Sequence, residues 1–247
     1  MGFFDSLIRK NFEPLENLSG IVTDMHSHLI PGIDDGSKTI EESIDLVNKL
    51  IELGYKKIIT TPHIMSDYYR NTEAGILAGL DTLRKALDEA NIQIDISAAA
   101  EYYADFDFTQ KIQKDKLLTF GNKYLLFEIS YFSPPDSVEE IIFNIQTNGY
   151  KPVLAHPERY IYWHNKFEIY EKLKDRNVYF QLNINSLCGH YSLPVMKIAE
   201  KMIKNKMFEF VGSDTHNSNH ILLIRESMKN PNLRKLVESG ILINPDL

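Results

Sequence analysis

Short apolar runs alternate with amphipathic segments along most of the chain. The apolar runs are rich in Ile, Val, Leu and Phe and end at Gly, Pro or polar residues, a pattern that predicts β-strands. They cover residues 21–25, 57–61, 94–100, 124–127, 152–155, 178–182 and 208–212. The amphipathic segments repeat apolar residues every three or four positions, which predicts helices. They cover residues 39–53, 73–90, 136–148, 165–175 and 193–205.

The helix predicted over residues 39–53 has clear boundary signals. Thr39 and Glu42 fit a capping box, in which two side chains accept hydrogen bonds from backbone N–H groups of the first turn. Gly54 follows the last periodic residue and predicts the end of the helix.

Seven strand-and-helix units in series predict an α/β fold with one parallel sheet. We expect the sheet to close, or nearly close, into a distorted (β/α)7 TIM-like barrel, with an open doubly wound sheet as the alternative. No internal repeat, low-complexity stretch or Pro/Gly/Ser linker interrupts the series. The sequence therefore predicts one domain over residues 20–247, preceded by a flexible leader over residues 1–19.

Bulk composition narrows the class of protein. The net charge of −7 argues against a nucleic-acid-binding surface, which needs clustered Lys and Arg. Cys188 is the single cysteine, so no intrachain disulfide can form, and we expect a cytoplasmic protein. No run of about 18 apolar residues predicts a transmembrane helix. The start of the chain, residues 1–6, fits a loose myristoylation pattern, but a leader is the better interpretation.

Polar residues that bind metals follow six of the seven predicted strands. They are His26, His28, His63, Glu101, Glu128, His156, Asp214 and His216. In a βα barrel the carboxyl ends of the strands meet around one mouth, so we expect these side chains to converge there. Imidazole and carboxylate ligands without a thiolate suit Mn²⁺, Zn²⁺ or Fe. Their number exceeds what one ion needs and predicts two or three ions.

The motifs around these residues occur in a recognisable order. They are DMHSHLIPGIDDGS at residues 24–37, TPH at 61–63, AEY at 100–102, FEIS at 127–130, AHPERY at 155–160 and GSDTHN at 212–217. Together they resemble the polymerase and histidinol phosphatase (PHP) superfamily, and in particular its capsule-type bacterial tyrosine phosphatases. The resemblance covers about residues 20–217, and PG-x-DDG with HPERY is its most specific part.

The resemblance implies three metal sites, usually filled by Mn²⁺, in a barrel of the PHP type. The first would use His26, His28, Glu101 and Asp214; the second Glu101, Glu128 and His156; and the third Asp35, His63 and His216. Asp34 is the neighbouring alternative to Asp35.

The resemblance also implies substrate contacts. Arg159 would bind the phosphate, because its forked donors suit phosphoryl oxygens. The family carries a second Arg soon after Asp-x-His; here the next is Arg225, nine residues beyond His216. Apart from the resemblance, Tyr102, together with Tyr68, Tyr69 and Tyr103, lies just beyond the strand ends that carry predicted ligands. These tyrosines would line a groove for phosphotyrosine or else pack as half-buried aromatics.

The predicted reaction is hydrolysis of a phosphate monoester by water that divalent cations activate, with Arg159 neutralising the phosphoryl oxygens. Asp214 or His216 would shuttle the proton of the leaving group. By resemblance the substrate is a phosphotyrosine protein, the tail of a membrane tyrosine kinase in capsule or exopolysaccharide assembly. That partner would place the chain in the cytoplasm beside the inner face of the membrane, and a homo-oligomer is compatible with the sequence.

Other functions stay open at this point. A PHP-type small-molecule phosphatase, such as histidinol phosphatase, or a nuclease would share the site. An amidohydrolase also begins with His-x-His, but it usually needs a Lys after the fourth strand and a His after the sixth, where this chain has Glu128 and Asn183 or Asn185. A non-catalytic, metal-binding regulatory partner is the alternative from another class. A phosphocysteine mechanism is disfavoured, because Cys-x5-Arg from Cys188 would need an Arg where Pro194 stands.

Overall fold

Two parallel sheets form the centre of the structure, a computed structural model that describes residues 13–114, 116–135 and 137–247. The first sheet has the order β1 (Thr23–Asp24), β2 (Lys57–Thr60) and β4 (Asp95–Ala98). The second has the order β3 (His63–Ile64), β5 (Glu101–Tyr103), β6 (Tyr124–Glu128), β7 (Lys151–Ala155), β8 (Tyr179–Asn183) and β9 (Phe210–Gly212). Every strand pair within them is parallel, as the alternating pattern predicts.

The two sheets follow one curled path. β2 continues into β3, and β4 into β5, after interruptions at residues 61–62 and 99–100. The backbone N–H of Ala99, in the second interruption, donates to the carbonyl of Thr60 at the end of β2, at 2.9 Å. An isolated bridge between Ser27 and Thr215 brings the carboxyl ends of β1 and β9 together. The prediction of a single α/β domain with a curled parallel sheet is confirmed, whereas no ladder joins β1 to β9 in the described residues.

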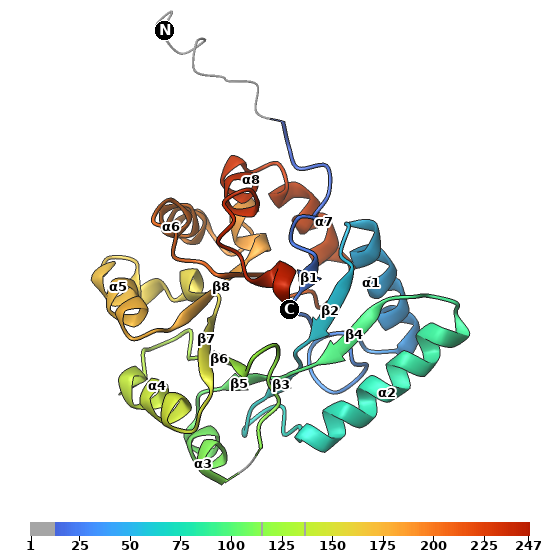
Figure 1. Ribbon diagram of the computed structural model, residues 1–247, viewed down its shortest axis with the longest axis horizontal. Helices are drawn as coiled ribbons and strands as arrows, with labels where there is room; N and C mark the ends of the chain where they lie inside the picture. Colours follow the sequence, from blue (N-terminus) through green and yellow to red (C-terminus); the bar gives the residue numbers. More distant parts are fainter. Residues whose placement is uncertain (1–12, 115, 136) are drawn as a thin grey trace, which may run out of the picture.

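Helices surround the strands on the outside (Figure 1). They are α1 (Ile40–Glu52), α2 (Glu73–Glu89), α3 (Phe106–Lys114), α4 (Val138–Thr147), α5 (Glu168–Asp175), α6 (Leu193–Lys204), α7 (Ser218–Ser227) and α8 (Pro231–Val237). Short 3₁₀ helices are η1 (Pro157–Arg159), η2 (Ile161–Trp163), η3 (Ile184–Cys188) and η4 (Asn244–Asp246). The five predicted helices are present. The apolar pattern did not predict α3, α7 and α8, which have nine, ten and seven residues.

Helix α1 begins as its capping signal predicts. The Thr39 hydroxyl accepts a hydrogen bond from the backbone N–H of Glu42, at 3.3 Å. The Glu42 carboxylate reaches back to the N–H of Lys38, one residue before the expected partner, at 2.7 Å. Leu46, Val47 and Leu50 form its buried face. The cap satisfies N–H groups that have no partner inside the helix, so it fixes where the helix begins.

The packed body begins before residue 20. Leu18 is fully buried, and its N–H donates to the carbonyl of Leu53 at 2.7 Å. The N–H of Leu15 donates to Met228 at 3.1 Å. Residues 1–12, which carry the myristoylation-like pattern and most of the predicted leader, and the predicted helix start at residue 136 lie outside the described residues.

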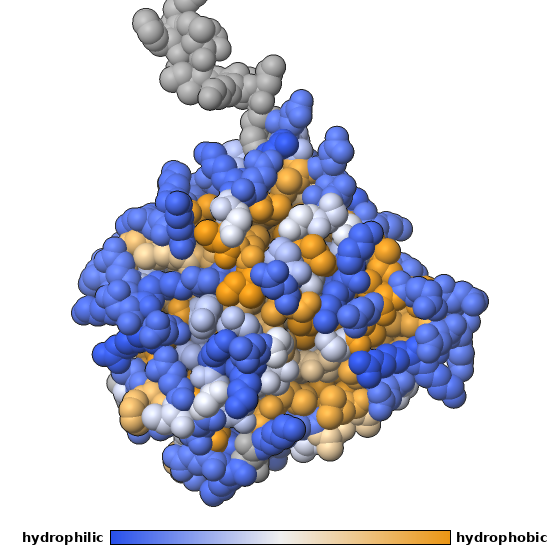
Figure 2. Space-filling view, in the orientation of Figure 1, coloured by the Kyte–Doolittle hydropathy of each residue, from blue (hydrophilic) through white to orange (hydrophobic). Residues whose placement is uncertain are grey.

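The C-terminus lies at the amino ends of the strands, near the centre of Figure 1. There the Asn244 side chain donates to the carbonyls of Thr23 in β1, at 2.9 Å, and Val211 in β9, at 2.8 Å. Hydrophobic residues gather toward the middle of this face, and hydrophilic residues cover most of its rim (Figure 2). None of the described helices is long and apolar enough to cross a membrane.

Candidate metal centre

The nine side chains named from the sequence as metal ligands lie together at the carboxyl ends of the strands. They come from β3, β5 and β6 and from the loops after β1, β7 and β9. Each belongs to a group of three or four residues whose ligand atoms lie within 4.8 Å of one another. These groups are His28, Asp35, His63 and His216; His26, His28 and Asp214; His26, Glu101 and His156; and His63, Glu101 and Glu128.

The most buried part of the cluster contains the two imidazoles of the His-x-His motif. Nε2 of His26 lies 3.2 Å from Oε2 of Glu101 and 3.4 Å from Oδ1 of Asp214. Nε2 of His28 lies 3.5 Å and 3.4 Å from the same two oxygens. For metal–ligand bonds of about 2.0–2.1 Å, the edge of a tetrahedral ligand set is about 3.4 Å. His26, His28 and Asp214 therefore have the spacing of ligands around one cation, and Glu101 lies beside both imidazoles but groups with other ligands.

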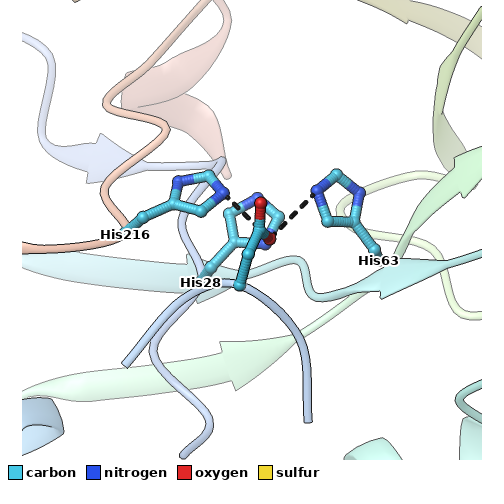
Figure 3. A group of neighbouring side chains, drawn as sticks. His28, His63 and His216 are labelled. Carbon is cyan, nitrogen blue, oxygen red and sulfur yellow. Dashed lines mark ion pairs between the residues drawn. The ribbon is translucent and has the colours of Figure 1, made fainter. Parts of the chain in front are cut away.

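A second part of the cluster surrounds Asp35. Its Oδ1 lies 3.5 Å from Nε2 of His63 and 3.4 Å from Nε2 of His216. Figure 3 shows His28 between His216 and His63, with both flanking rings turned toward the carboxylate. The rings of His28 and His216 are stacked, with centroids 4.0 Å apart.

Glu101 connects the remaining ligands. Nδ1 of His63 lies 3.2 Å from Oε2 of Glu101 and 3.3 Å from Oε1 of Glu128. Nε2 of His156 lies 3.1 Å from Oε1 of Glu101 but 4.0 Å from Glu128. The resemblance grouped His156 with both glutamates, whereas here His63 is closer to Glu128. The reason is that His63 presents both ring nitrogens to the cluster.

Contacts outside the cluster hold the imidazoles in place. Nδ1 of His26 lies 2.9 Å from Oε1 of Gln181, and Nδ1 of His28 lies 2.8 Å from Oδ2 of Asp34. One nitrogen of each ring is thus anchored, which turns the other toward the cluster. Asp34 also accepts a hydrogen bond from the N–H of Gly36, at 2.9 Å. Asp34 therefore orients His28, and Asp35 is the aspartate that faces the cluster.

The chemistry of the donor set fits divalent cations. Nδ1 of His63 is buried and has no hydrogen-bond partner among the described residues, although two carboxylates lie near it. Burial alone would raise the pKa of Glu101, but the imidazoles, with His26 the strongest, hold it well below its usual value. Burial would also raise the pKa of Asp214, but the neighbouring imidazoles outweigh it and hold that pKa well below its usual value. Buried carboxylates in this number need positive charge beside them.

Arg159 lies beside the cluster on η1. Its Nη1 is 3.2 Å from Oδ2 of Asp214, and its guanidinium lies between two rings, 4.5 Å from the centroid of Tyr131 and 4.0 Å from that of Tyr191. The Asn183 side chain donates to Oδ2 of Asp214 at 2.6 Å and to the Tyr191 hydroxyl at 2.9 Å. Stacking and pairing together fix the plane of the guanidinium.

Comparison with known proteins gives the family. A sequence model described as capsular polysaccharide synthesis, CpsB/CapC, matches residues 22–233. The chain belongs to this family. Its resemblance to the capsule-type bacterial tyrosine phosphatases, predicted from the motifs, is therefore confirmed.

Named relatives of the CpsB/CapC family match most of this chain. The tyrosine-protein phosphatase YwqE of Bacillus subtilis is 28% identical over 78% of this chain and 77% of its own length. The tyrosine-protein phosphatase CpsB of Streptococcus pneumoniae is 28% identical over 78% of this chain and 82% of its own. The putative tyrosine-protein phosphatase CapC of Staphylococcus aureus is 24% identical over 88% of this chain and 86% of its own length.

Solved structures agree with the sequence match. A crystal structure from work on YwqE of Bacillus subtilis and CpsB of Streptococcus pneumoniae, described as unique metal-dependent tyrosine phosphatases, has a TM-score of 0.76. The two sequences are 27% identical, and the match covers 83% of this chain and 84% of the solved chain. An amidohydrolase from Mycoplasma synoviae has a TM-score of 0.51 at 10% identity, and the match covers 90% of this chain and 83% of the amidohydrolase chain. This likeness shows a shared fold alone.

A pocket of about 460 Å³ opens over the cluster in this family member. Arg159 lines it, and four tyrosines do so as well: Tyr69, Tyr103, Tyr131 and Tyr191. Burial raises the pKa of Tyr131 well above its usual value, and Arg159 opposes that shift. The sequence patterns gave no signal for Tyr131, Tyr191 or Gln181, because these side chains reach the site through loop conformation and strand pairing rather than through a motif.

Two predicted substrate contacts lie elsewhere. The Tyr102 side chain is fully buried; its hydroxyl donates to Glu73 at 3.2 Å and accepts from the N–H of Leu118 at 2.8 Å. Arg225, on α7, pairs with Glu52 of α1 at 3.3 Å on an exposed surface. Neither residue lines the pocket over the cluster. Tyr102 is thus a packing aromatic, and Arg225 an outer surface residue.

Proposed function

We propose that this chain is a metal-dependent protein-tyrosine phosphatase, a phosphoric monoester hydrolase. The observation that carries the proposal is one pocket that combines a multi-cation ligand cluster with a fixed, cationic Arg159. A phosphate monoester carries negative charge on several oxygens and needs both kinds of partner. The names of the family relatives support the same activity.

The ligand set would hold two to three ions, with Mn²⁺ as the proposed native metal and Fe or Zn²⁺ as substitutes. His26, His28, Glu101 and Asp214 would hold one. Asp35, His63 and His216 would hold another, and Glu101 with Glu128 and His156 a third. Bound divalent cations lower the pKa of water and neutralise charge that develops on phosphoryl oxygens.

The chain's own side chains orient the substrate. Arg159 directs N–H donors at a phosphoryl oxygen, because stacking on Tyr131 and Tyr191 limits rotation of its guanidinium. Both carboxylate oxygens of Asp214 have partners, so this residue holds the site together. His216 lines the pocket wall, and its Nδ1 is anchored on the carbonyl of Asp214 at 2.9 Å, which turns Nε2 toward Asp35 and the ion that these residues would hold.

In this proposal the fold is a distorted TIM-like barrel of the PHP type, formed by the curled sheet. The Ser27–Thr215 bridge supports closure at the site, and the Asn244 contacts support it at the opposite end. Closure between β1 and β9 matters because His26, His28 and Asp214 follow these two strands and must meet.

The proposed substrate is a phosphotyrosine protein, the tail of a membrane tyrosine kinase of capsule or exopolysaccharide synthesis. The family description and the relatives named tyrosine-protein phosphatases support this choice. The enzyme would then work in the cytoplasm beside the inner face of the membrane. A histidinol-phosphatase-like activity and a non-catalytic regulatory role are the alternatives that the experiment must separate.

The test is hydrolysis of para-nitrophenyl phosphate, a phosphotyrosine peptide, a phosphoserine peptide and histidinol phosphate, with and without Mn²⁺. We expect metal-dependent hydrolysis that favours the phosphotyrosine peptide and is lost in His28→Ala and Glu101→Ala. Circular dichroism shows whether each variant is folded. Full activity in both folded variants would refute the site, and preference for histidinol phosphate would refute the protein substrate.

A further inference from the structure

The hydroxyl of Tyr131 lies against the metal-ligand cluster. Its oxygen is 3.2 Å from Nε2 and 3.3 Å from Nδ1 of His156. An oxygen this close to both ring nitrogens lies over the face of the imidazole, where neither in-plane lone pair points. The contact is therefore a poor hydrogen bond, and the described residues offer this hydroxyl no other acceptor.

The imidazole of His156 already has a partner within the metal-ligand cluster. Its Nε2 faces Oε1 of Glu101 at 3.1 Å, within the group that would share a cation. A nitrogen used in that way has no lone pair left to accept the Tyr131 proton. The Tyr131 side chain is 36% exposed and lines the pocket, so water can accept this proton until an oxygen of the substrate takes its place.

Tyr131 and Arg159 occupy the same wall of the pocket. The guanidinium carbon of Arg159 lies 4.5 Å from the centroid of the Tyr131 ring, and both side chains line the pocket. This wall thus presents guanidinium N–H groups and one phenolic O–H to the same space. Arg225, the second phosphate contact expected from the sequence, lies on the outer surface instead.

We propose that the Tyr131 hydroxyl donates a hydrogen bond to a non-bridging phosphoryl oxygen of the substrate, next to the oxygen that Arg159 binds. Tyr131 is then a further catalytic residue, and it supplies a donor that Arg225 does not. The proposal rests on the phosphatase function proposed above. It involves no transfer of the Tyr131 proton, only a hydrogen bond that strengthens as charge develops on the phosphoryl group.

The competing explanation is packing. The Tyr131 ring stacks on His156 and on Tyr160, with centroids 5.7 Å and 5.6 Å apart. Tyr131→Phe keeps those contacts and the stacking on Arg159, and removes only the hydroxyl. Tyr68→Phe is the matched control, because Tyr68 is 75% exposed and does not line the pocket.

The experiment measures the Mn²⁺-loaded proteins. We expect Tyr131→Phe to lower kcat/KM for aryl phosphates about 10- to 100-fold, the range for a lost hydrogen bond to a charged group. Inorganic phosphate should bind about tenfold more weakly by calorimetry, with the melting temperature and the bound metal content unchanged. Tyr68→Phe should match the wild type with para-nitrophenyl phosphate.

A series of aryl phosphates with different leaving-group pKa values identifies the oxygen. A loss of the same size across the series supports the phosphoryl oxygen. A loss that grows with leaving-group pKa, unchanged kinetics and phosphate binding, or a loss that follows reduced metal content would each overturn the proposal. An inactive wild-type protein would instead refute the proposed function, so the two failures are distinguishable.

Discussion

The Nε2 atoms of His26 and His28 lie 3.3 Å apart in the buried centre of the site. Their outer nitrogens are held by Gln181 and Asp34. Burial works to lower the pKa of His28, but Asp34 and the other carboxylates outweigh it and raise the pKa well above its usual value. Two lone pairs that face each other at this distance repel unless a proton or a cation lies between them.

This arrangement predicts that metal removal destabilises the fold. Chelation with EDTA should lower the melting temperature by about 5–15 °C, because a cation at 100 to 1,000 times its Kd stabilises the folded state by about 3–4 kcal/mol. Differential scanning calorimetry with EDTA, then with added Mn²⁺, measures the loss and its recovery. A melting temperature indifferent to EDTA in metal-loaded protein would contradict the prediction.

Arg159 and Arg225 should differ sharply in effect. Arg159→Ala removes the guanidinium that faces the pocket, and kcat/KM for para-nitrophenyl phosphate should fall by about 100- to 1,000-fold. Arg225→Ala removes only an exposed pair with Glu52 and should leave kcat/KM within about twofold of wild type. Equal losses in steady-state kinetics would show that Arg225 contributes to the site.

Asn183 should be needed for metal affinity although it faces no cation. Asn183→Ala removes the donor at 2.6 Å from Asp214 and frees that carboxylate to rotate. Loss of such an outer contact typically lowers metal affinity about 10- to 100-fold. Titration of metal-free protein with Mn²⁺ measures this. Asn205→Ala, an exposed helix-end change on α6, is the control, and equal affinities in the two variants would count against the role.

Gly212 should tolerate no side chain. A Cβ at this position would lie 2.6 Å from Cβ of His26 and 2.7 Å from Nε2 of Gln181, closer than atoms can pack. Gly212→Ala should lower the free energy of unfolding by about 1–3 kcal/mol, the usual cost of overpacking. Urea denaturation measures it. Wild-type stability together with wild-type metal affinity would show that the β9 end can move aside.

Glu158 should make stability depend on pH. Burial raises its pKa to about 7 from a usual 4.5, against the hydrogen bonds from Ser186 and Asn183. The unfolded chain releases this proton first, so the contribution of Glu158 to stability falls as pH rises from about 4.5 to 7, by about 3 kcal/mol. Glu158→Gln has no such proton to lose. Its free energy of unfolding should therefore rise relative to that of the wild type between pH 5 and pH 8, as measured by urea denaturation. A difference independent of pH would contradict this.

The sequence by itself determined the βα order, five of the eight described helices and the nine side chains that meet. It could do so because strand and helix periods are local, and because parallel strands bring their carboxyl ends to one edge. His63 and Glu128 could be named without coordinates for that reason. The sequence also indicated the family, since the motifs occur in order over most of the chain.

Only the tertiary structure decided which atoms face each other. Asp34 and Asp35 are neighbours in sequence, yet one holds His28 and the other faces the cluster, because the turn at Gly36 directs their side chains apart. Tyr102 and Tyr131 are both tyrosines near strand ends, and only packing sends one into the core and the other into the pocket. Side-chain direction across long sequence separations depends on the packed interior as a whole, which no local pattern encodes.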